Sequence, residues 1–388
     1  MATALCLYSI LIVGLDSQVF PSVLTQIGDT PYQQGLVLAS FLLLFPLSSI
    51  FAGLIADRIG KRIVLFFGAL FLAIPFAISA AVTQLWIRVL ALLLFGIGYG
   101  TVESQASALL TDIHRGKERS IVNLSQLFYS IGAAGGPFLI ALAFKILPTL
   151  SVQRIFWTVT AVTSTVAIGF ACIRETNTQE VPARSGGLRM VIGDPQGRLL
   201  LLIMFFYVAA ELGTSGWLAK YAQVHLLLPQ TIAPIAITLF WSGLGLSRAI
   251  VGFSIHRVPD THILTVAFII SLIARIAAFL GSSPFSSMIL FFIIGFGMGT
   301  VWPTLVAIIG ARFKETSGSA VGLIIAVGGI ASPIIHQIIG VVSREQLLGL
   351  RYTMLSLGIF TLINLCIIRK LSKLKVTSDE QTTCTPKQ

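Results

Sequence analysis

Most of this chain consists of uninterrupted apolar segments, each long enough to cross a membrane as a helix. An α-helix needs about 20 consecutive apolar residues to cross roughly 30 Å of hydrocarbon. Hydrophobic residues make up 55% of the 388 positions and charged residues only 11%, against about a quarter charged in soluble domains. Continuous runs exclude the alternating strands of a membrane β-barrel. We therefore predict an all-α membrane protein with twelve transmembrane helices, at residues 2–26, 33–56, 63–82, 86–111, 120–147, 155–174, 199–226, 231–255, 262–281, 285–311, 317–342 and 349–369.

The chain also repeats itself. Residues 96–103 (GIGYGTVE) return as 295–302 (GFGMGTVW), at an offset of 199 residues, the separation of Gly96 from Gly295. The same offset carries residues 53–58 onto 252–257, so two separate segments agree on one register. Parallel repetition of hydrophobic halves is typical of secondary transporters. The sequence thus predicts two six-helix pseudo-repeats, which differ where Glu103 of the first corresponds to Trp302 of the second.

Positive charge is unevenly distributed among the expected loops. Most of the 26 Lys and Arg residues fall in the loops of one side and near the C-terminus. By the positive-inside rule we expect both termini in the cytoplasm and the protein in the inner cell membrane. The net charge of +11 then reflects topology and contact with lipid headgroups of the bilayer, and does not indicate a nucleic-acid partner. The four cysteines show no metal-binding spacing and three lie in or at spans, so we expect no metal site and no disulfide. We also expect no cofactor.

A polar segment rich in Pro, Gly and Ser separates the halves. We expect an N-terminal six-helix bundle at 1–174, a cytoplasmic linker at 175–198 and a C-terminal six-helix bundle at 199–371. Residues 372–388 are rich in Lys, Thr and Ser, and we expect them to form a disordered cytoplasmic tail.

Three acidic residues fall inside the expected spans. An ionised carboxylate at mid-membrane costs about 2.5–3.5 kcal/mol on insertion scales, so such residues face a cavity or a partner. Glu103 shares a helix face with Tyr99, and Glu211 repeats that spacing with Tyr207. Asp16 lies well inside the first span. We expect all three acids to bind protons or solute. The structural alternatives are a permanent pair with an Arg for Glu103 and a place near the outer interface for Asp16.

Residues 53–62 (GLIADRIGKR) resemble the signature of the loop between the second and third spans in the major facilitator superfamily. With twelve spans in two halves, the resemblance covers the whole chain and implies the major facilitator fold. In such proteins the Asp and Arg of the motif pair across helix ends, so the resemblance implies that Asp57 and Arg58 are gating residues here. We assign Arg62 to the same gate, although anchoring of a helix end explains it equally well.

Several spans together resemble the fucose/galactose/glucose:proton symporter family. The segments concerned are Gly14-Leu15-Asp16, Glu103, 123–128 (NLSQLF), Glu211 with Trp217 and Tyr221, 240–243 (FWSG) followed by Arg248, and Pro303-Thr304. The resemblance implies that the acids of spans 1 and 4 handle sugar and proton, and that amides of span 5 contact the sugar. Asp16, Glu103 and Gln126 fit this pattern, but Tyr129 stands where the sugar carriers often place Asn.

The remaining candidates are polar or aromatic. Asn123 and Gln126 share a helix face and offer hydrogen bonds to hydroxyl groups, with helix packing as the alternative. Arg248 is the natural counter-charge for one of the acids. Three tryptophans of the second half can stack on a sugar ring, although most membrane tryptophans are interfacial anchors: Trp217, Trp241 and Trp302.

Two further cations fall in second-half spans. Lys220 lies near the end of the seventh span, and we expect its side chain to extend to the membrane surface. Arg275 matches no pattern and receives no role.

Residues 132–137 (GAAGGP) bear on the direction of transport. Drug:proton antiporters of the superfamily carry a Gly-x-x-x-Gly-Pro-x-x-Gly-Gly signature in span 5, and here Ile140-Ala141 replace its final pair. Close helix packing explains the glycines as well.

We therefore predict proton-coupled symport of a sugar or another small polar solute by a monomeric carrier with alternating access. The alternative is proton-driven export of drugs or metabolites. A membrane-embedded enzyme or an ATP-driven pump lacks support, because the sequence contains no metal-binding His spacing, nucleophile elbow or P-loop.

Overall fold

The computed structural model describes residues 1–388 apart from 29, 174–186, 255–258, 282, 314–315 and 384–388, and it leaves undescribed the side chains of 57, 118–119, 187, 251–254, 317–319 and 374–383. The first half contains α1 (Ala2–Ser17), α2 (Val19–Ser22), η1 (Leu24–Gln26), α3 (Pro31–Leu42), α4 (Phe45–Ile59), α5 (Lys61–Ala81), α6 (Leu85–Ile113), α7 (Glu118–Ile146) and α8 (Val152–Cys172). The second half contains α9 (Gly187–Gly193), α10 (Pro195–Ser215), α11 (Leu218–Val224), α12 (Ile235–Ser254), α13 (Asp260–Leu280), α14 (Pro284–Gly299), α15 (Val301–Arg312), α16 (Ser317–Val342), α17 (Gly349–Ser356) and α18 (Gly358–Thr383).

These helices make up the twelve expected spans. Among the described residues, eleven segments are long and apolar enough to cross a membrane, and a shorter apolar helix at Ile235–Ile250 occupies the place of the remaining expected span at 231–255. Some spans consist of two helices in series, as in α10 with α11 and α14 with α15. Broken helices inside a membrane are tolerated where the freed backbone groups line a cavity or are buried in protein. The all-α fold predicted from the apolar runs is confirmed.

The repeated glycines make equivalent contacts in the two halves. A Cβ on Gly98 of α6 would lie 2.6 Å from a backbone atom of α5, and a Cβ on Gly297 of α14 would lie 2.7 Å from one of α13. Likewise, Gly96 approaches the backbone at the α3–α4 junction, and Gly295 approaches that of α12. Spans 4 and 10 therefore pack in the same way on their neighbours, because only glycine lets the backbones come so close.

The glycines of span 5 pack α7 on α1. A Cβ on Gly132 would lie 1.9 Å from the carbonyl oxygen of Leu11, and one on Gly136 would lie 3.0 Å from that of Leu15. In the opposite direction, a Cβ on Gly14 would lie 2.2 Å from the carbonyl oxygen of Tyr129. The pattern at 132–137 is thus accounted for by close helix packing within the first half.

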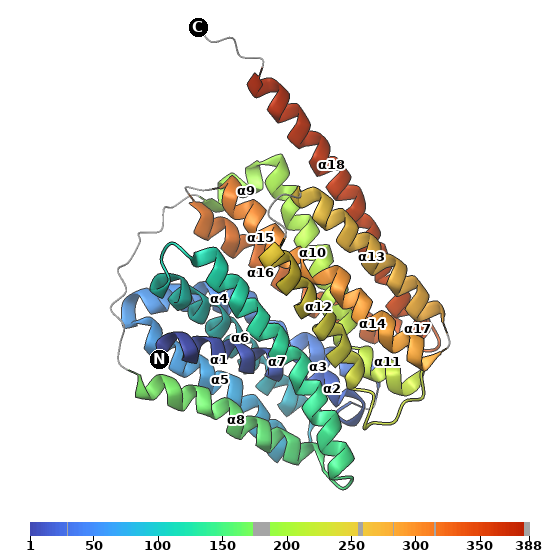
Figure 1. Cartoon of the computed structure of the whole chain (residues 1–388). Helices are drawn as coiled ribbons and strands as arrows, with labels where there is room; N and C mark the ends of the chain where they lie inside the picture. Colours follow the sequence, from blue (N-terminus) through green and yellow to red (C-terminus); the bar gives the residue numbers. More distant parts are fainter. Residues whose placement is uncertain (29, 174–186, 255–258, 282, 314–315, 384–388) are drawn as a thin grey trace.

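The two halves contact each other at the ends of the spans that lie on the side opposite the termini. Near the start of α3, Gly35 is so close to Gly340 of α16 that a Cβ would lie 2.8 Å from its Cα. At the end of the first span, Thr25 donates a hydrogen bond of 2.7 Å to Gln223 beyond the break in span 7. Figure 1 shows the first half (blue to green) and the second (yellow-green to red) coming together at α2, α3 and α11. The structure is therefore closed on the side opposite the termini.

Both expected polar segments contain helix. Within the described part of the linker, residues 187–193 form α9 and Asp194 caps α10 by accepting a hydrogen bond of 2.7 Å from the Gly197 amide. For residues 372–383 the expectation of disorder is wrong, because α18 continues as a helix to Thr383 and projects from the bundle (Figure 1). Residues 384–388 of the expected tail lie outside the described residues.

Candidate functional site

A cavity between the halves contains most of the predicted site residues. Its volume, including the part open to solvent, is about 510 Å³, and it is lined from the first half by α3, α4, α6 and α7 and from the second half by α10, α12, α15 and α16. Seven predicted residues line it, and the sequence analysis singled them out for charge, amide or aromatic character: Glu103, Gln126, Tyr129, Glu211, Trp241, Arg248 and Trp302. A pocket with a few convergent polar groups on an aromatic background is typical of a small-molecule site.

The charges of this cavity come from both halves. Glu103 lies on α6, Glu211 on α10 and Arg248 on α12, and all three line the cavity. Glu103 is within interaction range of Tyr99, Gln126 and Arg248. Two carboxyl groups thus share one guanidinium, an arrangement that is neutral when one of the acids carries a proton.

Arg248 links the halves across the cavity. Its Nη1 donates to Ser130 Oγ at 3.1 Å and to the backbone oxygen of Gln126 at 3.3 Å, both on α7. Its Nε donates to the Gly299 carbonyl at 3.2 Å, at the break between α14 and α15. A guanidinium has five donors in a fixed fork, which allows these contacts and an interaction with the acids at once.

Two residues that line the cavity each have a buried polar atom without a hydrogen-bond partner among the described residues. The atoms are Trp241 Nε1 and Ser332 Oγ. The Trp241 ring also packs edge-on against Tyr129, with ring centroids 5.5 Å apart. A buried donor left without a partner costs about 1–3 kcal/mol, so such atoms point to a ligand or to water.

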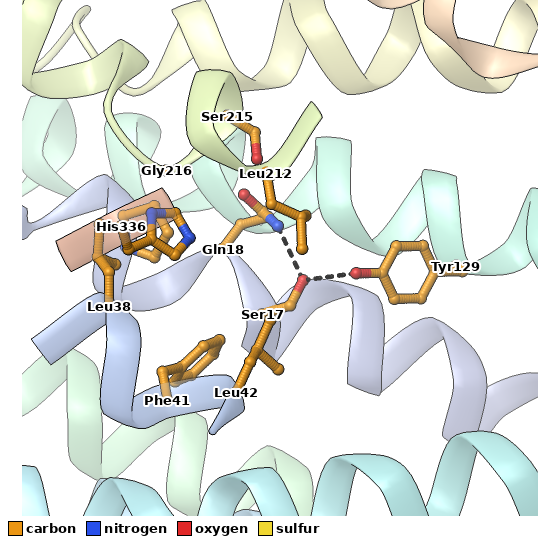
Figure 2. A pocket seen from close by; sticks show the side chains of 11 residues that line it. Ser17, Gln18, Leu38, Phe41, Leu42, Tyr129, Leu212, Ser215, Gly216 and His336 are labelled. Carbon is orange, nitrogen blue, oxygen red and sulfur yellow. Dashed lines mark hydrogen bonds between the residues drawn. The ribbon is translucent and has the colours of Figure 1, made fainter. Parts of the chain in front are cut away.

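A second, smaller cavity of about 310 Å³ lies next to the first, and Figure 2 shows residues that line it. Ser17, Gln18 and His336 line it, and Tyr129 lines both cavities. Behind its wall, Trp217 Nε1 donates to His336 Nδ1 at 3.3 Å, which leaves the ring proton of a neutral His336 on Nε2.

Hydroxyl groups connect the two cavities. Tyr99 Oη donates to Tyr129 Oη at 2.9 Å, and Tyr129 Oη donates to Ser17 Oγ at 3.2 Å. Gln18 Nε2 donates to the same Ser17 oxygen at 2.9 Å, and Figure 2 shows these last two bonds. The amide oxygen of Gln18 is buried and has no hydrogen-bond partner in the described part of the chain.

Three predicted site residues do not line the central cavity. Asp16 is fully buried between α1 and α8, where its carboxylate oxygens lie 3.0 and 2.9 Å from Thr163 Oγ1. Trp217 is fully buried and bonded to His336, and Asn123 is half-buried on α7, outside the lining of both cavities. A helix in a bundle has one face packed against its neighbours and another face toward the cavity. Asp16 lies on the packed face of α1, so its side chain points into the interior of its own half.

The predicted gate residues occupy helix ends on the side of the termini. Arg62, at the start of α5, donates from Nε to the Phe170 carbonyl at 2.9 Å, at the end of α8, and Lys61 pairs with Asp112 of α6. Basic groups there satisfy the carbonyls that every helix end leaves free. Arg58 is exposed, and the side chain of Asp57 lies outside the described residues.

The expectation for Lys220 is wrong, because its side chain does not reach the membrane surface. Lys220 is buried between the halves, donates to Gln34 Oε1 of α3, and lies 5.1 Å from the centre of the Trp217 ring. The expectation assumed one continuous helix, in which successive side chains are rotated by about 100° per residue. The break between α10 and α11 interrupts this rotation, so the direction of the Lys220 side chain cannot be counted from residues of α10.

Sequence reasoning missed Ser332 and left Tyr99 outside the site. Ser332 stands in a Gly-rich apolar helix, where a lone serine indicates helix packing. Tyr99 did carry a signal, since it lies one turn before Glu103 on the same helix face.

Comparisons with known proteins agree with this architecture. A model of the Major Facilitator Superfamily matches residues 6–336. Sodium-dependent glucose transporter 1A of Mus musculus is 23% identical over 347 residues, which cover 79% of this chain and 80% of that protein.

Solved structures share the fold. A bacterial homologue of the human lysosomal transporter Spinster, inward-facing and unoccupied, matches with a TM-score of 0.79, 15% identity and 96% coverage of both chains. The Escherichia coli fucose:proton symporter FucP matches with a TM-score of 0.65 and 17% identity, over 95% of this chain and 98% of that one. The chain belongs to the major facilitator superfamily and is a membrane transporter, not an enzyme.

Proposed function

We propose that this protein carries a sugar or another small polar solute together with a proton by alternating access. The observation that carries the proposal is the cavity between the halves, which combines two carboxyl groups, one guanidinium and two buried polar atoms without partners. Polyhydroxylated solutes offer both donors and acceptors for such groups. Relatives named as glucose and fucose carriers support this class of solute.

The charge of the cavity supports coupling to one proton. With Glu103, Glu211 and Arg248 all ionised, the lining residues have one negative charge in excess. A single proton on either acid makes the set neutral, which lets the loaded carrier reorient without exposing net charge to lipid. One proton moving down 100 mV supplies about 2.3 kcal/mol. We assign the proton to Glu103 and the pairing with Arg248 to Glu211.

We further propose that the side of the termini is cytoplasmic, that the protein acts as a monomer in the inner cell membrane, and that the two six-helix bundles move about the linker. The excess of positive loops on that side supports the orientation. The structure is then closed toward the outside, the state from which solute leaves into the cytoplasm.

Transport by purified protein in proteoliposomes tests the proposal. A panel of sugars, polyols and other polar solutes is offered with an imposed pH gradient, and in parallel with a sodium gradient at equal pH. We expect accumulation of one solute driven by the pH gradient and unaffected by sodium. Accumulation driven by sodium alone would overturn the proton coupling, and exclusion of a cationic dye without uptake of any polar solute would favour the exporter.

The variant Glu103→Gln sharpens the test. Because a permanently neutral amide can reorient but cannot release a proton, we expect it to abolish proton-driven accumulation and to retain exchange of labelled for unlabelled solute. Unaltered accumulation by this variant would remove Glu103 from the coupling.

A further inference from the structure

A hydrogen-bonded row of hydroxyl groups runs from Tyr99, one helical turn before Glu103 on α6, to the smaller cavity. Tyr99 lies within interaction range of Glu103, Tyr99 donates to Tyr129 at 2.9 Å, and Tyr129 donates to Ser17 at 3.2 Å. Tyr99 and Tyr129 are buried, as is Ser17 at 5% exposure. Each hydroxyl both donates and accepts, which is the property that lets a proton pass along a row.

The far end of this row has features of a water site. The smaller cavity brings Ser17 Oγ, the unpartnered Gln18 Oε1, Ser215 and His336 together (Figure 2). Water enters a buried space when two to four polar groups can bind it, and these groups meet that condition. This cavity lies on the closed side, between α3 and α16, which pack directly on each other there.

We propose that Ser17, Tyr129 and Tyr99 form a proton relay between the smaller cavity and Glu103. The inference rests on the proposed role of Glu103 as the proton site. The relay lets Glu103 exchange its proton with the side opposite the termini, while the solute uses the central cavity. Solute and proton therefore take different routes on that side of the binding site.

The transfer balances at every atom. Ser17 Oγ takes a proton from hydronium in the smaller cavity, which leaves neutral water, and gives its own proton to Tyr129 Oη, which gives its own to Tyr99 Oη, which gives its own to the Glu103 carboxylate. Each oxygen forms one O–H bond and loses one, so no charge stays on the hydroxyls. In the structure both tyrosines donate toward Ser17, and Ser17 donates to the Gly14 carbonyl at 2.7 Å. For the two tyrosines, that orientation is the one left after a proton has reached Glu103, and rotation of the three hydroxyls resets the row.

The variant Ser17→Ala interrupts the relay without altering the lining of the central cavity. Its matched control is Ser9→Ala, since Ser9 is also buried on α1 and also donates to the carbonyl three residues before it. We expect Ser17→Ala to slow proton-driven accumulation by ~10-fold or more relative to solute exchange at equal pH. Ser9→Ala should leave that ratio as in the wild type. For the wild type we expect heavy water to slow accumulation more than exchange.

Tyr99→Phe is the second variant and keeps the test decisive if Ser17→Ala does not fold. Its affinity for solute is measured by calorimetry, so that loss of binding is not taken for loss of the relay. Equal slowing of accumulation and exchange would mean that the hydroxyls serve packing only, and would overturn the relay. Wild-type coupling in both variants, alongside loss of coupling in Glu103→Gln, would overturn the relay and leave the proposed function standing. Retained coupling in Glu103→Gln would instead overturn the proposed function.

Discussion

Arg248 is the residue that ties the chemistry of the cavity to the contact between the halves. Its guanidinium bonds α7 and the α14–α15 break, and it is the cation within range of both cavity acids. Protonation of an acid weakens that acid's attraction for the guanidinium and leaves the contacts with α7 unchanged. A change of one proton can therefore alter how firmly the halves are held together at mid-membrane.

At the same scale, Trp241→Phe tests whether the solute is polar. The change deletes the unpartnered indole N–H and keeps an aromatic ring in place. Loss of one neutral hydrogen bond should cost about 0.5–1.5 kcal/mol, or about 2- to 12-fold in Kd, measured by calorimetric titration with the best solute. Trp86→Phe is the control, because Trp86 is exposed on the outer surface of α6. An unchanged Kd would remove the indole N–H from the site.

At the scale of helices, the breaks within spans determine where the residues of the site lie. Arg275 of α13 is fully buried and serves two of them: it donates to Thr214 Oγ1 at 2.8 Å, next to the α10–α11 break, and to the Met354 carbonyl at 3.2 Å, next to the α17–α18 break. Helix ends leave carbonyl groups without intrahelical partners. Arg275, to which the sequence analysis assigned no role, thus holds two helix ends in place.

Gly35→Ala tests the close contact of α3 with α16. The added methyl group would lie 2.8 Å from backbone atoms of α16, so we expect the closed state of the side opposite the termini to be destabilised by about 1–3 kcal/mol. A cysteine introduced at Leu38, in a background without the native cysteines, should then react faster with a thiol reagent applied from the closed side. Gly135→Ala is the control, since no described atom of another element lies within 4 Å of the place its methyl group would occupy. Equal reactivity in the two variants would contradict the prediction.

Asp194→Asn tests the ion pair between the described end of the linker and α15. Asp194 accepts two hydrogen bonds from Arg312, at 2.8 and 2.9 Å, and this guanidinium holds the pKa of Asp194 below its ordinary value of 3.8. A depressed pKa stabilises the folded state above the ordinary value and loses that effect as pH falls through the lower one.

Asparagine keeps the helix cap and removes the charge. We therefore expect the variant Asp194→Asn to have a lower melting temperature than the wild type at neutral pH. Once the pH is well under 3.8, the two proteins should have the same melting temperature. Thermal unfolding in detergent at a series of pH values measures this. A difference that persists at low pH would mean that geometry, and not charge, carries the contribution.

For the whole molecule, reorientation requires the closed side to separate. Thr25 and Gln223 lie on opposite halves and are joined there by a hydrogen bond of 2.7 Å. Cysteines at both positions, joined by a short reducible cross-linker, should stop transport, and reduction should restore it. The matched control is either single cysteine treated in the same way. Transport at the normal rate by the cross-linked protein would show that this side does not open.

The amino-acid sequence alone determined the membrane class, the twelve spans and the two-fold repeat, because length, hydropathy and glycine spacing are local properties that survive without tertiary context. It also selected Glu103, Gln126 and Arg248, since a charge or amide inside an apolar run is costly unless it faces a cavity. Tertiary structure alone decided which polar residues share that cavity. Asp16 turned toward Thr163, Lys220 was buried at Gln34, and Ser332 entered the lining. The directions of these side chains depend on how each helix is rotated, on the breaks within spans and on the contact between the halves. All three depend on contacts between residues far apart in the chain.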